Sequence, residues 1–405
     1  MLDVEKIRKD FPMLQKDIVY LDNSATTFKP QCVIDSFVDS YDNCTANAHR
    51  GDYKLALTVD QKYEETRKLV SEFINCDIDE VVFTYGATSA LNTIAEGYCR
   101  KHLKKGDVII STLAEHASNI LPYFKLKQEL GIEVVYVPFD ADGRVTLENF
   151  ESVMSDKVKF VAINYVSNVL GYVNPIKDIC TIAHKYGALV AVDGAQSTPH
   201  LKTDVKDLDC DFLAFSSHKM CGPSGVGVLY GKKKLLDQMD PLLLGGGSNA
   251  RFYSNGEILL KESPYKFEAG TQPIEAIIAF GQAIKYLQNI GMENIREREI
   301  ALRDYALDKL KKLDNITIYN PTTDSGIITF NVKNIFSQDV ASYLGSKNIC
   351  LRSGNHCAKI LVDFLGVSAT VRCSLYFYNT FEEIDKFVEE LKDISIEKCI
   401  DSVIF

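Results

Sequence analysis

The chain has 405 residues, 46% of them hydrophobic and 25% charged, which is the composition of a globular protein with about two or three domains. Its 45 Lys and Arg against 55 Asp and Glu give a formal charge of −10, and this disfavours binding to nucleic acid or to an anionic membrane. Eleven cysteines without a C-x-x-C pair argue against a disulfide framework or a cysteine-rich zinc site. The N-terminal MLDVEKIRKDF has no apolar signal segment, and no apolar run could cross a bilayer. We therefore expect a protein of the reducing cytoplasm.

Short apolar runs rich in Val, Ile and Phe follow one another between residues 80 and 231. They are EVVFTY from Glu80, VIIST from Val108, IEVVYVPF from Ile132, KFVAINYV from Lys159, ALVAVDGAQ from Ala188, DFLAFSS from Asp211 and GVGVLYG from Gly225. Helical stretches at 88–103, 119–131 and 176–187 separate several of them. Such alternation predicts an α/β fold with a mostly parallel sheet and helices on both faces.

The pattern changes after about residue 265. Long helical stretches at 273–290 and 293–313 precede shorter strand candidates, and the stretch 381–394 has the 3.6-residue periodicity of a helix. We predict a large α/β domain over 15–265 and a smaller α+β domain made of 1–14 and 266–405.

Polar residues follow the predicted strands at their carboxyl ends, which is where open α/β sheets bind ligands. They are Gly86, Ala87, Thr88 and Ser89; Glu115 and His116; Ser167 and Asn168; Asp193 and Gln196; and Ser216, Ser217, His218 and Lys219. Any one of them is most simply a helix cap or a solvated loop residue. Together they predict one crevice, in which the small and hydroxyl residues that open the helix after Tyr85 form an anion cradle.

Lys219 lies between apolar DFLAF and glycine-rich CGPSGVGVLYG, which indicates an interior position. A partly desolvated lysine has a lowered pKa and can form a Schiff base. Asp193 ends an apolar strand and needs a cationic partner. A lysine, an anion cradle and a buried aspartate together match the requirements of pyridoxal 5'-phosphate.

A second group of residues is RSGNHCA from Arg352. Cys357 beside His356 is either an activated thiolate or an ordinary loop cysteine. Arg372, among apolar residues, either holds a substrate carboxylate or forms an internal salt bridge. The seven histidines have no metal-ligand spacing, and we predict no metal.

Together the motifs resemble the cysteine desulfurases, which are fold-type-I pyridoxal phosphate enzymes of the class-V aminotransferase group. The matching segments are YLDNSATT at Tyr20, HRG at His49, GATSALN at Gly86, EH at Glu115, SNVLG at Ser167, VDGAQ at Val192, SSHK at Ser216 and EAGT at Glu268. RSGNHCA is similar to the R-x-G-x-H-C-A signature of the SufS/Csd-like branch. The resemblance covers nearly the whole chain and implies a seven-stranded-type sheet plus a smaller α+β domain that carries the Cys357 loop.

The resemblance also implies a reaction, in which L-cysteine becomes L-alanine and Cys357 becomes a persulfide. Lys219 would carry the internal aldimine, and Cys357 and His116 would complete the catalytic set. Cofactor-binding residues would be Thr88, His116, Asp193, Gln196, Ser216, His218, Lys219 and, from a neighbouring subunit, Thr271. The substrate carboxylate would be bound by Asn168 and Arg372.

By the same resemblance, the chain is expected to be a cytoplasmic homodimer. Its sulfur would pass to a SufE- or SufU-like acceptor protein for iron–sulfur cluster assembly or a related pathway. Ala117, Tyr172 and Asn355 depart from the usual residues of this branch, so the partner and the preference for sulfur or selenium stay open. Alternatives are a selenocysteine lyase or another class-V lyase, a Cys–His hydrolase, and a non-catalytic scaffold.

Overall fold

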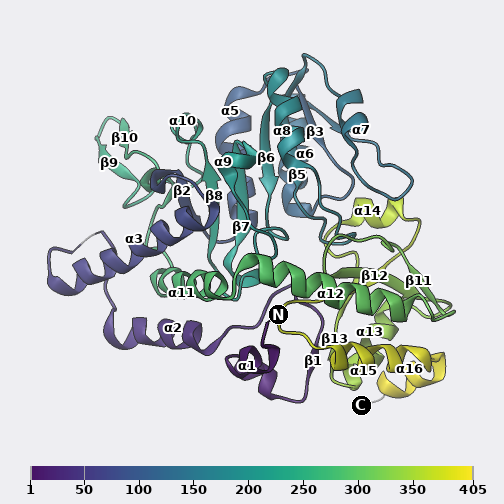
Figure 1. Ribbon diagram of the computed structural model, residues 1–405. Helices are drawn as coiled ribbons and strands as arrows, with labels where there is room; N and C mark the ends of the chain where they lie inside the picture. The colour runs from purple at the N-terminus through teal and green to yellow at the C-terminus, as the bar shows by residue number, and fades with distance from the viewer. Residues whose placement is uncertain (1, 50, 404–405) are drawn as a thin grey trace.

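The computed structural model describes residues 2–49 and 51–403 and places a seven-stranded sheet beside a four-stranded one (Figure 1). The strands of the larger sheet are, in spatial order, β2 (Val81–Thr84), β8 (Gly227–Gly231), β7 (Phe212–Ser216), β6 (Leu189–Asp193), β5 (Val158–Asn164), β3 (Val108–Ser111) and β4 (Glu133–Tyr136). Of these strands, β8 runs antiparallel to both neighbours, and the other pairings are parallel. The predicted mostly parallel sheet is confirmed, and each of the seven apolar runs forms one strand.

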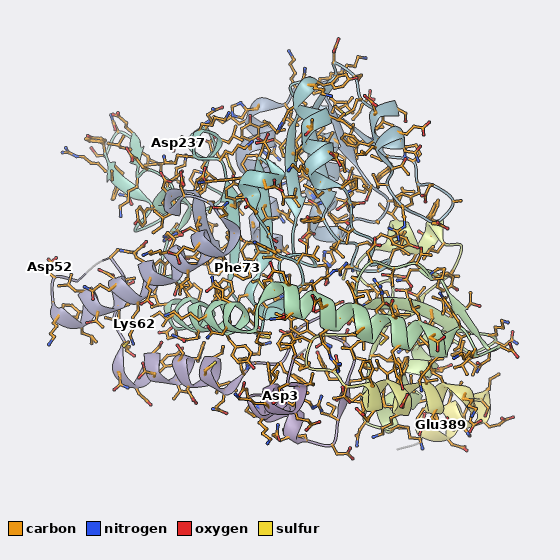
Figure 2. All side chains as sticks on the ribbon, in the orientation of Figure 1. Asp3, Asp52, Lys62, Phe73, Asp237 and Glu389 are labelled. Atoms are coloured by element: carbon orange, nitrogen blue, oxygen red, sulfur yellow. The ribbon has the colours of Figure 1, made fainter. Side chains whose placement is uncertain are left out.

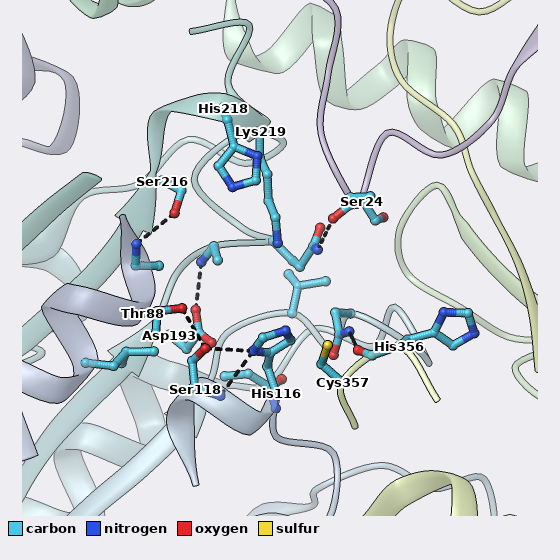
Figure 3. A pocket seen from close by; sticks show the side chains of 18 of the residues that line it. Ser24, Thr88, His116, Ser118, Asp193, Ser216, His218, Lys219, His356 and Cys357 are labelled. Atoms are coloured by element: carbon cyan, nitrogen blue, oxygen red, sulfur yellow. Dashed lines mark hydrogen bonds between the residues drawn. The ribbon is translucent and has the colours of Figure 1, made fainter. Parts of the chain in front are cut away.

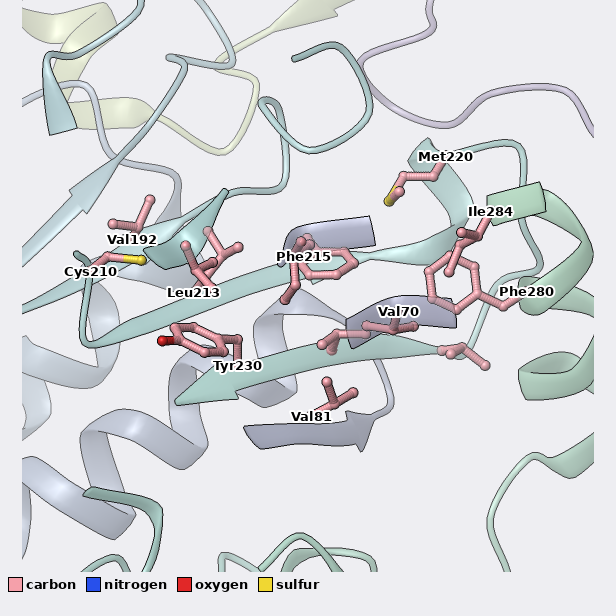
Figure 4. Packing of buried hydrophobic residues seen from close by; sticks show 14 of the residues in the cluster. Val70, Val81, Val192, Cys210, Leu213, Phe215, Met220, Tyr230, Phe280 and Ile284 are labelled. Atoms are coloured by element: carbon pink, nitrogen blue, oxygen red, sulfur yellow. The ribbon is translucent and has the colours of Figure 1, made fainter. Parts of the chain in front are cut away.

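Side chains of the larger sheet alternate between two faces, and each face has its own apolar cluster. Val81 and Phe83 belong to one cluster, whereas Val82 belongs to the other, because successive strand residues point to opposite faces. The first cluster takes in α3 (Lys54–Ile74), α8 (Ile176–Lys185) and α11 (Ile274–Ile290), and the second takes in α4 (Ala87–Ile94), α6 (Leu121–Leu130) and α10 (Lys233–Leu236). In Figure 4, Phe215 of β7 lies in the first cluster with Phe280 of α11. Each such buried side chain contributes about 1.5–3 kcal/mol.

The helix predicted over 88–103 is interrupted. It consists of α4, a π-helical segment (Ala95–Cys99) and the short α5 (Arg100–His102). Gly97 explains the widened turn: a Cβ there would lie 2.3 Å from the carbonyl oxygen of Asp240, whose own N–H donates to the Gly97 carbonyl at 3.1 Å. The close approach of a neighbouring backbone is a packing effect that local periodicity does not encode.

The four-stranded sheet has the order β11 (Ile316–Ile318), β12 (Ile327–Val332), β15 (Thr370–Ser374) and β14 (Arg352–Gly354), and its pairings are antiparallel. The helices around it are α12 (Met292–Leu310), α13 (Ser337–Ser346), α15 (Phe381–Lys392) and α16 (Ile396–Val403). Val19 and Leu21, near the start of the chain, belong to its apolar cluster. Phe11 and α11, by contrast, pack in the cluster of the larger sheet. The division into domains at residue 265 stays a prediction.

The chain has further α-helices and two short strand pairs. They are α1 (Val4–Lys9), α2 (Gln31–Asn43), α7 (Leu147–Ser152), α9 (Val205–Leu208), α14 (Lys359–Phe364) and the pairs β1 (Val19–Tyr20) with β13 (Ile349–Cys350) and β9 (Asn249–Phe252) with β10 (Ile258–Leu260). Charged side chains such as Asp3, Asp52, Asp237 and Glu389 lie at the periphery (Figure 2). Among the described residues, no helix is long and apolar enough to cross a bilayer. Arg50 of the HRG motif lies outside the described residues.

The helix α14 joins the two sheets. It begins two residues after Cys357, and its Leu361 packs in a small cluster with Leu170 and Tyr172 from the loop after β5. The ring of Phe364 also meets Phe139 edge-on, at 5.4 Å between centroids. The segment that carries Cys357 is therefore attached through β14 to the smaller sheet and through α14 to loops of the larger one.

Candidate active site

The predicted crevice exists at the carboxyl ends of the parallel strands. It is a pocket of about 190 Å³ in which the segments after β2, β3, β5, β6 and β7 meet the β14–β15 region (Figure 3). Ten of the predicted site residues line it: Thr88, His116, Asn168, Asp193, Gln196, Ser216, His218, Lys219, Cys357 and Arg372. The exception is Thr271, which is exposed and whose Oγ1 lies 3.5 Å from Nδ2 of Asn47. Other residues that line the pocket include Ser24, Ser118, Asn164 and Arg352, for which we predicted no role.

The predicted anion cradle lies at the start of α4. Gly86 precedes the helix with φ of 141° and no side-chain cap. The backbone N–H of Ala87 donates to Oγ of Ser216 at 2.7 Å, and the hydroxyls of Thr88 and Ser118 lie 2.7 Å apart. Free N–H groups and hydroxyls at a helix N-terminus favour a bound anion.

Lys219 reaches into the pocket from the turn after β7 (Figure 3). Burial lowers the pKa of its amine to about 8, because desolvation outweighs the attraction of Asp193. Burial also lowers the pKa of His218 to about 4, with Lys219 adding to the effect, so His218 is neutral at physiological pH. The site thus holds an amine that loses its proton readily, as nucleophilic attack on an aldehyde requires.

His116 begins the turn after β3. Its Nδ1 accepts the N–H of Ser118 at 3.2 Å, which assigns the ring proton of the neutral form to Nε2. Burial lowers the pKa of the imidazole. His116 is therefore a neutral ring whose tautomer is set by its own loop.

Glu115, for which we predicted no role of its own, lies buried behind His116. Its carboxylate accepts hydrogen bonds from the hydroxyl of Thr112, the side-chain amide of Asn119 and both nitrogens of Asn164, at 2.7–3.1 Å. Burial raises its pKa to about 7 despite these donors. This cluster joins the loop of His116 to the end of β5, where Asn164 lines the pocket.

The residues present fit pyridoxal phosphate. Gln196 provides an independent observation: its Nε2 donates to the Ser24 carbonyl at 2.8 Å, while its Oε1 is buried without a partner among the described residues. Such an oxygen can accept the cofactor's ring hydroxyl. The cradle suits a phosphate, Lys219 suits the aldehyde, and Asp193 suits a protonated ring nitrogen.

Arg372 is 2% exposed and lies on β15. It donates to the Asn168 carbonyl at 2.9 Å and to Oδ1 of Asp22 at 3.1 Å, whereas its Nε is buried without a partner in the described part of the chain. The predicted internal salt bridge is therefore present, and binding of a substrate carboxylate stays a prediction, for which the unpartnered Nε leaves one donor. The role of Asp22, 350 residues away in the sequence, had no sequence signal.

Cys357 is exposed and lines the same pocket as Lys219. Its carbonyl accepts the N–H of Ala117 at 2.7 Å. The imidazole of the adjacent His356 points away from Cys357 in Figure 3 and hydrogen-bonds to Thr370 at 3.0 Å. This geometry does not favour the Cys–His hydrolase.

Comparisons with known proteins agree with this geometry. The class-V aminotransferase profile matches residues 19–387. A probable cysteine desulfurase of Halalkalibacterium halodurans is 43% identical over 96% of this chain and 98% of its own length. The crystal structure of the cysteine desulfurase CsdA of Escherichia coli superposes with a TM-score of 0.91 at 32% identity, over 99% of both chains. The apo structure of the cysteine desulfurase of Thermococcus onnurineus NA1 superposes with a TM-score of 0.93 at 36% identity, over 97% of this chain and 98% of that one.

Proposed function

Because the chain belongs to the class-V aminotransferase family, among its cysteine desulfurases, we propose that pyridoxal phosphate binds in this pocket and that Cys357 takes sulfur from L-cysteine. The observation that carries the proposal is that an exposed thiol and a lysine of lowered pKa line one pocket. One amino acid bound there can meet both groups. The persulfide and the site residues below are parts of this proposal.

Thr88, Ser216 and His218 would hold the cofactor's phosphate at the start of α4. Gln196 would accept its ring hydroxyl, and Asp193 would face its ring nitrogen. The bound cofactor would supply an aldehyde for amines and a protonated ring that withdraws electrons from the substrate. Since His218 is neutral, the positive end of α4 contributes to phosphate binding.

Arg372 and Asn168 would orient the substrate by its carboxylate. The unpartnered Nε of Arg372 offers a donor that Asp22 does not use. Lys219, with a pKa of about 8, is suited to move a proton at the substrate Cα near neutral pH. His116, neutral and protonated at Nε2, would donate or accept a proton beside it.

Cys357 would act as the nucleophile. Its thiolate attacks the sulfur of L-cysteine, a new S–S bond forms, and the carbon–sulfur bond of the substrate breaks. The electron pair of the broken bond stays with the substrate carbon, which then takes up a proton. The balance is L-cysteine plus the Cys357 thiol giving L-alanine plus the Cys357 persulfide.

The quaternary structure and the sulfur acceptor are further parts of the proposal. Thr271 is exposed and does not line the pocket of its own chain, as expected if it serves the phosphate site of a second copy. Leu242, Leu243 and Leu244 expose apolar surface suited to such a dimer, and the loop that follows them bonds through Gly246 to Gly270, next to Thr271. The exposed Cys357 would hand sulfur to a SufE- or SufU-like protein in the cytoplasm, for iron–sulfur cluster assembly.

Mass spectrometry of Cys357 tests the proposal. Brief exposure of the protein to L-cysteine should add one sulfur atom to the peptide that contains Cys357 and release one alanine for each sulfur added. The exposed Cys32 is the internal control and should gain none. Alanine release without a modified Cys357 would contradict the proposal and favour another class-V lyase.

A further inference from the structure

The loop that carries Cys357 has an unusual backbone. His356 and Cys357 have φ angles of 50° and 56°, so two consecutive residues with side chains adopt the left-handed conformation. Such a conformation persists only where the surroundings fix it. The contacts of this loop are therefore the ones that decide where the thiol lies.

Three hydrogen bonds join His356 and Cys357 to other described segments of the chain. Nδ2 of Asn168 donates to the His356 carbonyl at 2.8 Å, and the N–H of Ala117 donates to the Cys357 carbonyl at 2.7 Å. The third joins Nε2 of His356 to Oγ1 of Thr370 at 3.0 Å. The first two come from loops of the larger sheet, and the third comes from β15, the strand that also carries Arg372.

The imidazole of His356 does not interact with the thiol beside it. It is 4% exposed, its Nδ1 has no partner among the described residues, and in Figure 3 it points away from Cys357. Burial, together with the nearby Arg372, lowers its pKa to about 3. His356 lines the pocket, yet its ring is bonded to Thr370 and turned away from Cys357, so this geometry does not favour proton transfer between the two.

We propose that His356 is a positioning residue, which fixes the Cys357 loop to β15 through Thr370 and so sets the place of the thiol relative to Arg372. The kinetic part of the proposal rests on the proposed function. Because β15 also carries Arg372, one strand fixes both the bound carboxylate and the attacking thiol. Small shifts of such groups change rates strongly, by up to about 100-fold for 1 Å.

Thr370 allows a test outside the pocket, since it is buried and does not line it. Thr370→Val keeps the shape of the side chain and removes the hydroxyl, and Thr370→Ser restores it. Thr66→Val is the matched control, because it removes a buried hydroxyl from α3 that donates to the Lys62 carbonyl. All variants should keep the visible absorbance of the bound cofactor.

We expect kcat for alanine release to fall about 10-fold in Thr370→Val with KM nearly unchanged, and to recover in Thr370→Ser. The pH profile of kcat should keep its shape. In a Cys32→Ser background, iodoacetamide should label Cys357 several-fold faster in Thr370→Val, because the already exposed thiol of a loosened loop adopts more positions in which the reagent can reach it. If His356→Asn folds, it should behave like Thr370→Val. If it does not fold, Thr370→Val and Thr370→Ser still test the proposal.

Unchanged kcat and labelling in Thr370→Val would overturn the proposal. So would a His356→Asn variant that loses one ionisation from the pH profile while Thr370→Val stays active, since His356 would then be a base. If the unaltered protein releases no alanine from L-cysteine, the proposed function fails, but the labelling comparison still tests the positioning role.

Discussion

Arg352 and Arg372 lie directly opposite each other on the antiparallel strands β14 and β15, and both line the pocket. Like charges in that position repel each other, and Asp22 provides a counter-charge to Arg372 at 3.1 Å. This wall of the pocket therefore favours an anion. The carboxylate of an amino acid is the anion that the proposed reaction supplies.

Replacing Arg372 should weaken substrate binding. For Arg372→Ala we expect KM for L-cysteine to rise roughly 10- to 100-fold, the range for losing hydrogen bonds to a charged group. Arg372→Lys keeps the charge but lacks the planar donor pair, so its KM should lie between those of the unaltered protein and of Arg372→Ala. Steady-state kinetics measure both. An unchanged KM in Arg372→Ala would mean that the carboxylate binds elsewhere.

Replacing Lys219 should remove the covalently held cofactor. The purified protein is expected to be yellow, and Lys219→Ala should lose the visible band of the lysine-linked cofactor. Lys266→Met is the matched control, because Lys266 is also buried but donates to the carbonyls of Asp237 and Met239, outside the pocket. Absorption spectra distinguish the two. A normal spectrum for Lys219→Ala would refute the assignment.

Replacing Cys357 should separate cofactor binding from sulfur transfer. Cys357→Ser is expected to stay yellow while releasing no sulfide from L-cysteine in the presence of a reductant, because serine is a poor nucleophile towards sulfur. Cys32→Ser, at the other exposed cysteine of the described residues, should keep full activity. Sulfide production by Cys357→Ser at the normal rate would exclude the persulfide step.

Glu115 should make the stability depend on pH. Its pKa rises from 4.5 to about 7 on folding. Its contribution to the free energy of unfolding is therefore full below pH 4.5 and is lost as the pH rises through 7. Glu115→Gln removes this dependence, and its amide can donate to Oδ1 of Asn119, which has no partner among the described residues.

Urea unfolding checks this prediction. Relative to Glu115→Gln, the unaltered protein should lose about 2 kcal/mol of unfolding free energy between about pH 5 and about pH 8. If the two proteins differed in unfolding free energy by the same amount at both pH values, Glu115 would not titrate in this range.

Glu268 should be required for stability. It holds the buried Arg67 with two hydrogen bonds of 2.7 and 2.9 Å and also accepts from Tyr63 and from the Phe83 N–H. Glu268→Ala leaves the buried guanidinium with only the partly exposed Glu64 as its counter-charge, which should lower the unfolding free energy by about 3 kcal/mol. Urea unfolding measures the change. Glu65→Ala is the control, since its pair with Lys285 is exposed and should change stability by under about 1 kcal/mol.

The sequence predicted what is local. The seven strands of the larger sheet follow from apolar runs, and eight of the ten predicted pocket residues follow from the rule that strand ends converge. Cys357 and Arg372 were predicted from their own sequence contexts instead. The interruption of the helix at Gly97 depends on a contact with Asp240, more than 100 residues away, and was not predicted. Likewise, the pairing of Arg372 with Asp22 joins the two ends of the chain, and no local pattern records it. The helices α2 and α3, which pack along α11, were also not predicted.

The attachment of the Cys357 segment at both ends has a consequence for the proposed delivery of sulfur. With β14 fixed on one side and α14 packed against Leu170 and Tyr172 on the other, the thiol has little freedom to swing outward. We expect the recipient to extend a reactive side chain of its own down to the protein surface at Cys357. Recipients with a flat, rigid docking face would then be served poorly, whatever their affinity.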